Sequence, residues 1–216
     1  MDEAMSRPAR HLVVFVKVPR RGQVKSRLAA GIGAGAALRF YRLTSALLLR
    51  RLARDRRWHT SLAVTPSRDV RAAFWPSGIR RLDQGSGDLG RRMARAFAAL
   101  PPGPAVIVGS DIPELDASHV AAAFRALGRH DAVFGPASDG GYWLVGLKRS
   151  RSLPRHLFAA VRWSSAHALA DTRAGLPRNW SVALLERLDD IDDATDYWRW
   201  AQGQKSQEVT PATTRG

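Results

Sequence analysis

An aspartate follows a short, strongly apolar segment near the middle of the chain, where the sequence reads Ala105-Val-Ile-Val-Gly-Ser-Asp111-Ile-Pro113. The bulky, mostly β-branched residues 105–108 predict a strand buried on both faces, which the following glycine and proline end. Asp111 is then expected just past the carboxyl end of a central strand, where open α/β sheets bind their ligands. A carboxylate there suits Mg²⁺ or Mn²⁺ carrying nucleotide phosphates. The alternative is an Asx-turn, in which the side chain caps its own backbone.

A basic segment, residues 17–28, leaves the first expected strand at its carboxyl end. Turn amides beside a glycine can hold a phosphate, and Lys25 and Arg27 can neutralise its oxygens, the arginine as a bidentate fork. The segment is not a P-loop, because Val24 stands where that motif needs glycine. The alternative is an exposed basic loop. The candidate phosphate-binding residues are Lys17, Pro19, Gly22, Lys25 and Arg27.

A glycine-rich segment, residues 83–93, leads from another expected strand into a helix. Glycines allow the backbone to approach a ligand closely, so this loop can wrap a base or ribose. Gln84, Gly87 and Asp88 are its candidate nucleotide-binding residues. Taken alone, however, the segment favours a simpler interpretation, in which Asp88 caps the helix that follows.

Two acidic segments lie in the second half of the chain. The first is Asp139-Gly-Gly-Tyr142, whose carboxylate can contact an acceptor or a metal, although a turn between two strands explains the same residues. The second places four carboxylates within five positions, at Asp189, Asp190, Asp192 and Asp193. Such charges repel one another unless a cation lies nearby, so one of them beside Asp111 would complete a divalent site. The alternative is a strongly capped helix start.

Composition narrows the class of protein. With 216 residues, 45% of them apolar, the chain has the size of one large α/β domain. The absence of cysteine excludes disulfides, thiolate zinc sites and cysteine nucleophiles. The net charge is +15, but the basic residues are almost all arginines scattered along helices, without a nucleic-acid-binding module. They indicate solvated helix faces that also attract phosphorylated ligands. No apolar run is long enough to span a bilayer, and the polar N-terminus is unlike a signal peptide, so we expect a cytoplasmic protein.

The elements that must position these residues alternate along the chain, which predicts a mostly parallel sheet with helices on both sides. The connection at residues 136–141 is too short for a crossover helix, so one neighbouring strand must be antiparallel or lie outside the sheet. Residues 31–35 are expected to form a flexible joint. We expect one domain over residues 11–200, with flexible tails at 1–10 and 201–216. The expected strands are 11–18, 60–65, 79–82, 105–108, 131–135, 142–147 and 181–185, and the expected helices are 36–54, 68–75, the later part of 87–100, 117–127, 164–174 and 193–200.

Five motifs in this order resemble the GT-A fold of the nucleotide-diphospho-sugar transferase superfamily, and more narrowly a bacterial family of GT-A-like, radical-SAM/selenodomain-associated transferases. The resemblance covers about residues 12–197. It implies a three-layer α/β/α, Rossmann-like fold with an antiparallel strand in the C-terminal half, a nucleotide-binding N-terminal half and an acceptor-binding C-terminal half. The chain departs from the family at Arg20-Arg21 and lacks the usual Thr-Pro after the last motif. The motifs are Lys17-x-Pro-x-x-Gly22-x-Val-Lys25-Ser-Arg27-Leu28, Gln84-x-Gly-x-Gly87-Asp-Leu-Gly90-x-Arg92, Gly109-Ser-Asp111-Ile-Pro113, Gly135-Pro-Ala-Ser-Asp139-Gly-Gly-Tyr142 and Asp190-Ile-Asp192.

The resemblance also implies roles for residues. Lys25 and Arg27 would bind phosphates, and Asp111 and Asp192 would hold Mg²⁺ or Mn²⁺. Asp111, Asp139 and Lys25 would be the catalytic residues. The acceptor pocket would be formed by Asp139, Gly140, Gly141 and Tyr142.

The reaction expected on these grounds is metal-dependent transfer from an activated nucleotide, with glycosyl transfer from a nucleotide-sugar favoured. The alternative is guanylyltransferase-like transfer of a nucleotidyl group from a nucleoside triphosphate to a small phosphorylated acceptor, because Pro113 stands where many sugar transferases have a second aspartate. A protein that binds nucleotides without catalysis and a basic nucleic-acid-binding module are the further alternatives. The expected partners are the nucleotide donor and a small acceptor, with no specific nucleic acid and no membrane span; a homodimer is one option for the oligomeric state.

Overall fold

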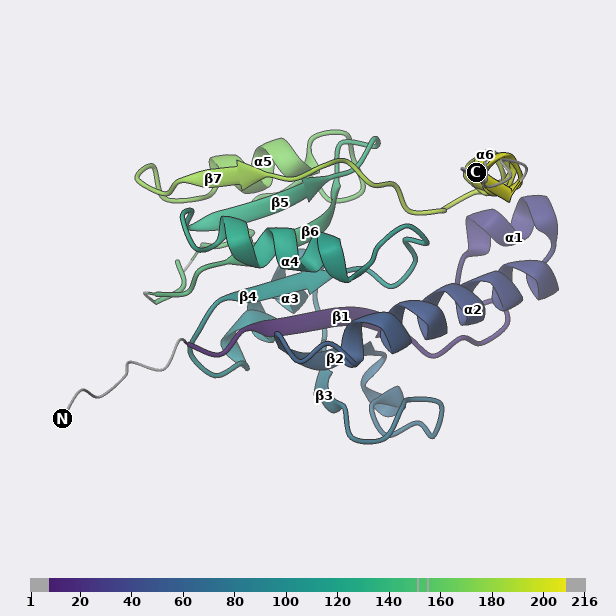
Figure 1. Ribbon diagram of the computed structural model, residues 1–216, viewed down its shortest axis with the longest axis horizontal. Helices are drawn as coiled ribbons and strands as arrows, with labels where there is room; N and C mark the ends of the chain where they lie inside the picture. The colour runs from purple at the N-terminus through teal and green to yellow at the C-terminus, as the bar shows by residue number, and fades with distance from the viewer. Residues whose placement is uncertain (1–7, 151, 155, 209–216) are drawn as a thin grey trace, which may run out of the picture.

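The computed structural model, which describes residues 8–150, 152–154 and 156–208, is built on one mixed sheet (Figure 1). Over these residues the sheet has seven strands in the order β3-β2-β1-β4-β6-β5-β7. All are parallel except β6, which is antiparallel to both β4 and β5. The expected mostly parallel sheet with one antiparallel strand in the C-terminal half is confirmed. The strands are β1 (His11–Lys17), β2 (His59–Thr65), β3 (Arg80–Asp83), β4 (Ala105–Val108), β5 (Ala132–Pro136), β6 (Tyr142–Leu147) and β7 (Val182–Leu184).

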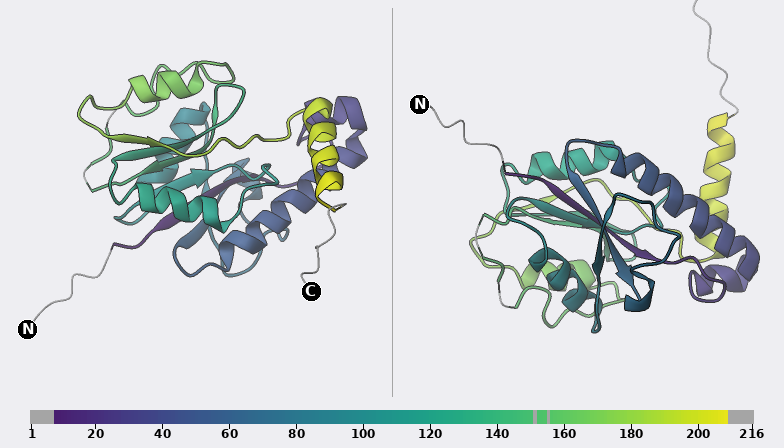
Figure 2. Two further views of the ribbon diagram at one scale, coloured as in Figure 1. Left: turned by 45° about the horizontal axis from the view of Figure 1, so that its top comes forward. Right: turned by 90° about the horizontal axis from the view of Figure 1, so that it is seen from below.

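Helices cover both faces of this sheet (Figure 2). On one face lie α2 (Ala34–Ala53) and α4 (Ala117–Ala126), and on the other lie α3 (Leu89–Ala98) and α5 (Ala168–Ala174). The central strand β1 supplies both cores, because successive side chains point to opposite faces. Leu12 and Val14 pack with α2 and α4, whereas Val13 packs with α3. The expected three-layer α/β/α architecture is therefore confirmed.

A third, smaller core lies beyond the carboxyl end of β1, where α1 (Ser26–Ile32) and the start of α2 meet the terminal helix α6 (Ala194–Glu208) (Figure 1). Phe40 of α2 meets Tyr197 and Trp200 of α6 edge to face, each with ring centroids 5.5 Å apart. At Gly31 a side chain would collide with the Cβ of Ala194. The glycine thus lets α1 and α6 approach closely, which brings the chain before α6 to the edge of the sheet.

Two predicted features of the N-terminal half are wrong. The flexible joint at 31–35 is a single residue, Gly33, between α1 and α2, because Gly31 and Gly35 belong to the helices. The helix predicted over 68–75 is only a 3-10 turn, η1 (Ser67–Asp69), followed by turns. Its side chains make other contacts: the buried carboxylate of Asp69 pairs with Arg20 at 2.7 Å, and the indole of Trp75 donates to the Asp69 carbonyl.

Two helices in the C-terminal half have different bounds from those predicted. Helix α5 begins at Ala168, four residues late, because Ser164 adopts a left-handed backbone (φ 57°) that cannot belong to a right-handed helix. Helix α6 continues to Glu208, so part of the predicted flexible tail is helical. Residues 1–7 and 209–216 of the predicted tails lie outside the described residues. No helix in the described part of the chain has both the length and the apolar character needed to cross a bilayer.

Candidate active site

Asp111 lies where β4 ends, in a loop tied to the end of β1. The preceding Ser110 is buried, with its hydroxyl 3.2 Å from that of Tyr41, on α2. The same Tyr41 oxygen accepts from the N–H of Lys17 at 3.1 Å and lies 3.2 Å from its carbonyl oxygen. Burial raises the pKa of Tyr41, which keeps the hydroxyl protonated and able to donate. One phenol therefore holds together the two strand ends that carry the candidate residues.

Lys25 lies at the centre of an acidic cluster. Its ammonium is 2.6 Å from a carboxylate oxygen of Asp111, 3.5 Å from one of Asp192 and 3.7 Å from one of Asp190. The lysine side chain is only 5% exposed. Its backbone is left-handed (φ 50°), a conformation that costs roughly 1–2 kcal/mol outside glycine. These ion pairs offset the strain, and sequence positions 25, 111 and 190–192 meet at one point.

The sequence Asp190-Ile-Asp192 explains how two carboxylates reach Lys25 together. Ile191 is buried in the small core between α1, α2 and α6, and its N–H donates to the Asp111 carbonyl at 3.4 Å. The side chains on either side of it remain 42% and 45% exposed. The buried isoleucine anchors the segment, and both neighbouring aspartates face the lysine.

Burial and charge act in opposite directions in this cluster. Burial by itself would lower the pKa of Lys25, but Asp111 and the other two carboxylates reverse this effect and raise it, so the lysine stays charged. Burial, reinforced by the negative charge of Asp111, raises the pKa of Asp190 to about 6. Arg27 is different, because its side chain is 75% exposed while its guanidinium pairs with Asp192 at 2.9 Å. It therefore faces solvent beside the acidic cluster and can contact an anion that arrives there.

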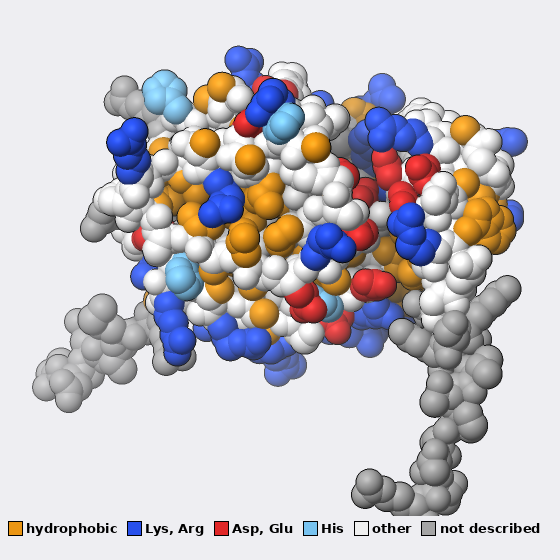
Figure 3. All heavy atoms as spheres, turned by 90° about the horizontal axis from the view of Figure 1, so that it is seen from above, with side chains coloured by type: hydrophobic (Ala, Val, Ile, Leu, Met, Phe, Trp, Pro, Cys, Tyr) orange, Lys and Arg blue, Asp and Glu red, His pale blue; other side chains and the backbone are white. Residues whose placement is uncertain are grey.

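Two cavities open on either side of Asp111, and they are labelled donor-side and acceptor-side after the expectation from the sequence. The donor-side cavity, about 470 Å³, lies over the ends of β1 and β4 and has the cations Lys17, Lys25 and Arg92 in its lining, together with Gln84 and Asp192. The acceptor-side cavity, about 230 Å³, lies over the start of β6 and the loop before α5. Asp111, Gly109 and Leu89 line both. Figure 3 shows acidic side chains gathered toward the end of the molecule that carries α1 and α6, with basic side chains beside them.

The acceptor-side cavity is shaped by the turn between β5 and β6. Asp139 accepts from the N–H of Gly141 at 2.8 Å, which closes the turn, and Gly140 is needed because a side chain there would collide with the Ala166 carbonyl. Tyr142 turns its hydroxyl toward Thr172 of α5, at 3.3 Å, and its ring lies 6.4 Å from that of Trp163. The predicted turn residues are thus brought beside an aromatic residue that sequence reasoning had not included.

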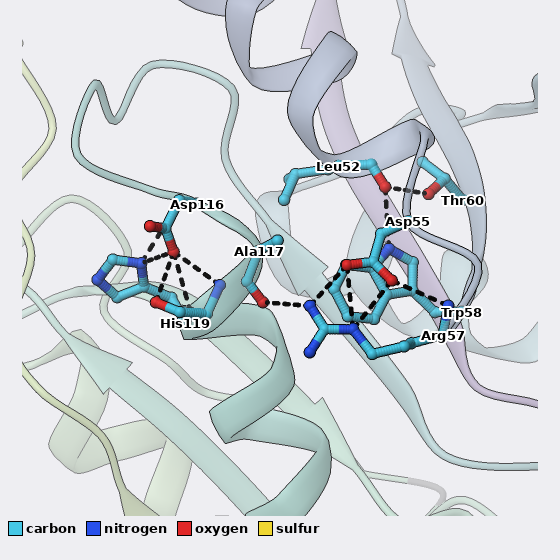
Figure 4. A network of polar contacts seen from close by, with 9 residues as sticks. Leu52, Asp55, Arg57, Trp58, Thr60, Asp116, Ala117 and His119 are labelled. Atoms are coloured by element: carbon cyan, nitrogen blue, oxygen red, sulfur yellow. Dashed lines mark hydrogen bonds and ion pairs between the residues drawn. The ribbon is translucent and has the colours of Figure 1, made fainter.

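A polar network holds the segment that follows Asp111 (Figure 4). Asp116 caps α4 by accepting from the N–H groups of Ser118 and His119, while the His119 ring accepts from the N–H of Asp116. The other ring nitrogen of His119 lies 3.3 Å from a carboxylate oxygen of Glu186, in the segment that runs from β7 to the acidic residues. Arg57, paired with Asp55, donates to the Ala117 carbonyl. These contacts link the Asp111 loop both to the end of α2 and to the chain before Asp190.

The structure gathers most of the predicted residues. Lys17, Lys25, Gln84, Asp111 and Asp192 line the donor-side cavity, and Asp139, Gly141 and Tyr142 line the acceptor-side cavity. Two predicted nucleotide-binding residues also have structural contacts: Asp88 caps α3 by accepting from the N–H of Arg91, and Gln84 donates its amide to the Ala63 carbonyl at 2.7 Å. The other predicted residues line neither cavity: Pro19, Gly22, Arg27, Gly87, Asp88 and Gly140.

Three further residues line these cavities: Asp190 and Arg92 stand in the sequence motifs but were not among the predicted ligands, and Trp163 was not predicted at all. The spacing Asp-x-Asp was a usable signal for Asp190, because residues two apart in an extended segment face the same way. Arg92 was within reach too, three residues beyond Leu89 on the first turns of α3, where side chains share a face. Trp163 lies in an irregular loop, and no local sequence pattern predicts that its side chain reaches the cavity.

The carboxylates suit a divalent ion in chemistry, since Mg²⁺ and Mn²⁺ prefer hard oxygen ligands. Among the described residues, however, no group of three or more histidine, aspartate or glutamate side chains is arranged to hold one. The positive charge among Asp111, Asp190 and Asp192 is the ammonium of Lys25. The donor set therefore fits a metal ion, while the present arrangement of the carboxylates is fitted to the lysine.

Several solved structures have a fold similar to that of this chain. A protein of Desulfovibrio desulfuricans G20, provisionally described as a nucleotide-diphospho-sugar transferase, is 27% identical over 94% of this chain and 91% of its own, with a TM-score of 0.78. The 4-diphosphocytidyl-2C-methyl-D-erythritol synthase of Anaerococcus prevotii is 12% identical over 91% and 98%, with a TM-score of 0.57. Rv0371c of Mycobacterium tuberculosis H37Rv, in complex with manganese, is 16% identical over 90% and 99%, with a TM-score of 0.52.

The likeness to these last two proteins is one of fold, and all three comparisons agree on the GT-A-like architecture expected from the motifs. No curated protein matches the chain. A family model matches residues 48–165, more than half of the sequence, and this stretch carries Gln84, Asp111 and Asp139. The chain belongs to the DUF2064 family, whose members are described as uncharacterized proteins conserved in bacteria.

Proposed function

We propose that this protein is a transferase that uses a nucleotide-activated donor, a nucleotide-sugar in the first place. The observation that carries the proposal is the position of Asp111, which lines both a cavity with three cations and a cavity with an aromatic wall. Such a residue lies where a donor and an acceptor would meet. The similarity to the Desulfovibrio protein supports the same class of reaction.

Each residue has a role that follows from its position. The donor's diphosphate would lie in the donor-side cavity against Lys25, and Arg27, which pairs with Asp192 outside the cavity lining, would reach it from solvent. As the sugar's anomeric C–O bond breaks, a hydroxyl oxygen of the acceptor forms the new bond, and its proton passes to a carboxylate such as Asp139. The nucleoside diphosphate leaves with negative charge, which the two cations stabilise. Asp111 and Asp192 would hold a divalent ion, which would supply further positive charge to stabilise the leaving group.

Nucleotidyl transfer is the second candidate. It is favoured by one feature of the β4 loop, where Asp111 is followed by Ile112 and Pro113 without a second carboxylate. In that reaction an acceptor phosphate oxygen would attack the α-phosphorus of a nucleoside triphosphate, and pyrophosphate would leave. The two reactions share the cation-lined cavity and differ in their products.

A thermal-shift screen tests the proposal. Nucleoside triphosphates and nucleotide-sugars are added to the protein with and without Mn²⁺, because a ligand that binds the native state raises Tm by mass action. We expect a Mn²⁺-dependent rise with one nucleotide-sugar, its loss in Asp111→Asn, and its retention in Glu114→Gln, an exposed carboxylate that lines neither cavity. A shift with a triphosphate alone, and pyrophosphate on turnover, would favour nucleotidyl transfer. No shift with any nucleotide would overturn both.

A further inference from the structure

The two cavities beside Asp111 have opposite charge. The acceptor-side cavity is lined by three carboxylates, Asp111, Asp139 and Asp190, and no lysine or arginine is among its lining residues. Lys25 pairs with Asp111 but contributes to the lining of the donor-side cavity only. The ammonium of Lys25, 2.6 Å from Asp111 and 3.7 Å from Asp190, offsets part of this negative charge from the donor side. An anion entering the acceptor-side cavity would nevertheless face three carboxylates and no lysine or arginine on the lining.

The rest of the wall suits hydroxyl groups and an apolar ring face. Trp163 and Tyr142 supply aromatic surface, and Ser164 adds a hydroxyl that can donate or accept. The hydroxyl of Ser165 is already used within the loop, where it donates to the Arg162 carbonyl at 2.6 Å. The tryptophan is held in place by packing, because at Gly90 a side chain would lie 2.8 Å from its ring and from Phe158. A pocket with apolar walls and a few convergent polar groups is typical of a small-molecule site.

We infer that the acceptor is an uncharged polyhydroxyl compound of the carbohydrate or polyol class, and not a phosphorylated one. The inference rests on the proposed function and names the substrate class of its second site. Acceptor hydroxyls would donate to Asp139 and Asp190 while a face of C–H groups lies against Trp163. When a ligand displaces water from these carboxylates, the ligand's hydroxyl groups replace the lost hydrogen bonds. A phosphate offers no such compensation, because its negative charge and those of the carboxylates would face one another unpaired.

This assignment bears on the choice between the two candidate reactions. Transfer of a nucleotidyl group to a phosphorylated acceptor needs an acceptor phosphate at Asp111, and on the acceptor side that phosphate would lie among carboxylates. A neutral hydroxyl acceptor has no such cost. The charge of the acceptor-side cavity thus favours glycosyl transfer by a route independent of the similarity to other proteins.

The test compares matched pairs of small molecules by saturation-transfer NMR, with and without Mn²⁺. The pairs are glucose and glucose 6-phosphate, N-acetylglucosamine and N-acetylglucosamine 6-phosphate, and glycerol and glycerol 3-phosphate. Because the chain carries a net charge of +15, phosphates will also bind elsewhere on its surface. Only the signal that is lost in Trp163→Leu and kept in Trp198→Leu, an exposed tryptophan of α6, is therefore counted.

We expect at least one neutral compound to bind about tenfold more tightly than its phosphate. In Asp139→Asn this preference should fall roughly fivefold, the effect of removing one nearby charge from a partly exposed site, and in Glu114→Gln it should stay. Equal or tighter binding of the phosphates, or no Trp163-dependent binding of any neutral compound, would overturn the inference. Neutral binding without any nucleotide-dependent thermal shift would instead overturn the proposed function and leave the acceptor-side assignment standing.

Discussion

Lys25 holds this site together through its ion pairs. Its ammonium is nearly buried and its backbone is strained, yet three carboxylates surround it. A buried charge is tolerated when it is paired, and removing one partner leaves the others uncompensated. The same lysine is therefore both the cation that holds the acidic residues close together and the cation best placed to receive a donor phosphate.

Replacing this lysine should separate phosphate binding from base binding. In Lys25→Met we expect the affinity for a nucleotide-sugar to fall about tenfold or more, since a charge-assisted contact is worth roughly 1.5–3 kcal/mol, while the affinity for the bare nucleoside falls far less. Isothermal titration calorimetry measures both. Lys148→Met, which lies outside both cavities, is the matched control. Equal losses for nucleotide-sugar and nucleoside would contradict a phosphate role.

The residues that could be predicted were those whose position is indicated by the neighbouring sequence. Asp111 follows a fully buried strand and Lys25 follows a glycine turn, so both could be placed at a strand end from sequence alone. Gln84 and Asp88 illustrate the limit, because each makes a backbone hydrogen bond as well as lying at the glycine-rich loop. Trp163 depends on the shape of an irregular loop, which no local periodicity reports.

At the scale of elements, the start of α4 offers a test through its cap. Burial tends to raise the pKa of Asp116, but hydrogen bonds from Ser118 and His119 outweigh it and lower the pKa to about 2. A carboxyl with a depressed pKa stabilises the fold above its unfolded value near 4, and this contribution is lost as the pH falls toward 2. The side chain is 47% exposed, so the contribution is modest.

Asp116→Ala should accordingly lower the free energy of unfolding by about 1 kcal/mol at pH 7, the usual value of an N-cap, which corresponds to about 2–4 °C in Tm for a chain of this size. The difference from the native protein should shrink as the pH is lowered from about 4 toward 2. Thermal melts across that pH range measure it. A difference that stays constant down to pH 2 would show that the carboxylate charge is not what stabilises the helix.

The contact between α1 and α6 gives a second prediction at this scale. Gly31→Ala favours the helix intrinsically by roughly 1 kcal/mol, but the new methyl collides with Ala194 and must push α6 away. Because Asp192 lies just before α6, we expect weaker nucleotide binding together with a lower Tm. The compensating change Ala194→Gly should restore both in the double variant.

Gly35→Ala is the control for this pair, since its nearest neighbour is the end of a flexible arginine at 3.8 Å. It should be neutral or slightly stabilising. Thermal melts and calorimetric titrations with the nucleotide identified by the screen follow all four variants. An unchanged nucleotide affinity and an unchanged Tm in the single variant Gly31→Ala would mean that α6 does not set the position of Asp192.

The elements that were predicted correctly are those whose pattern is set by burial. Strand β4 is apolar at every position because both of its faces are covered, and α2 shows an apolar stripe because one of its faces is. The predicted helix at 68–75 was wrong because side-chain contacts of Asp69 and Trp75 hold that segment in turns. The close approach of α1 and α6 depends on a glycine meeting an alanine 163 positions later, which no local window reveals.

At the scale of the whole molecule, two kinds of positive charge have to be distinguished. The net charge of +15 comes mainly from arginines, which are spread along the whole chain, in loops and strands as well as helices. Lys25 and Arg27, by contrast, are tied into one acidic cluster by ion pairs of 2.6 and 2.9 Å. The scattered charge should bind any polyanion, whereas the cluster should bind a small phosphorylated ligand of fitting shape.

Salt and a single substitution should distinguish nonspecific binding of polyanions from binding of a small phosphorylated ligand at the acidic cluster. Binding of a fluorescent 20-base-pair DNA of random sequence, followed by anisotropy, should weaken at least tenfold between 50 and 200 mM salt, because the released counterions set its strength. Asp111→Asn should leave that binding unchanged, since Asp111 contributes to the local cluster and the scattered arginines remain. The same substitution should abolish the Mn²⁺-dependent nucleotide shift, which is expected to survive 200 mM salt because paired, partly buried charges are screened less than exposed ones. DNA binding that resists salt, or that disappears with Asp111, would place a nucleic-acid site within the acidic cluster and contradict the assignment of that cluster to a nucleotide donor.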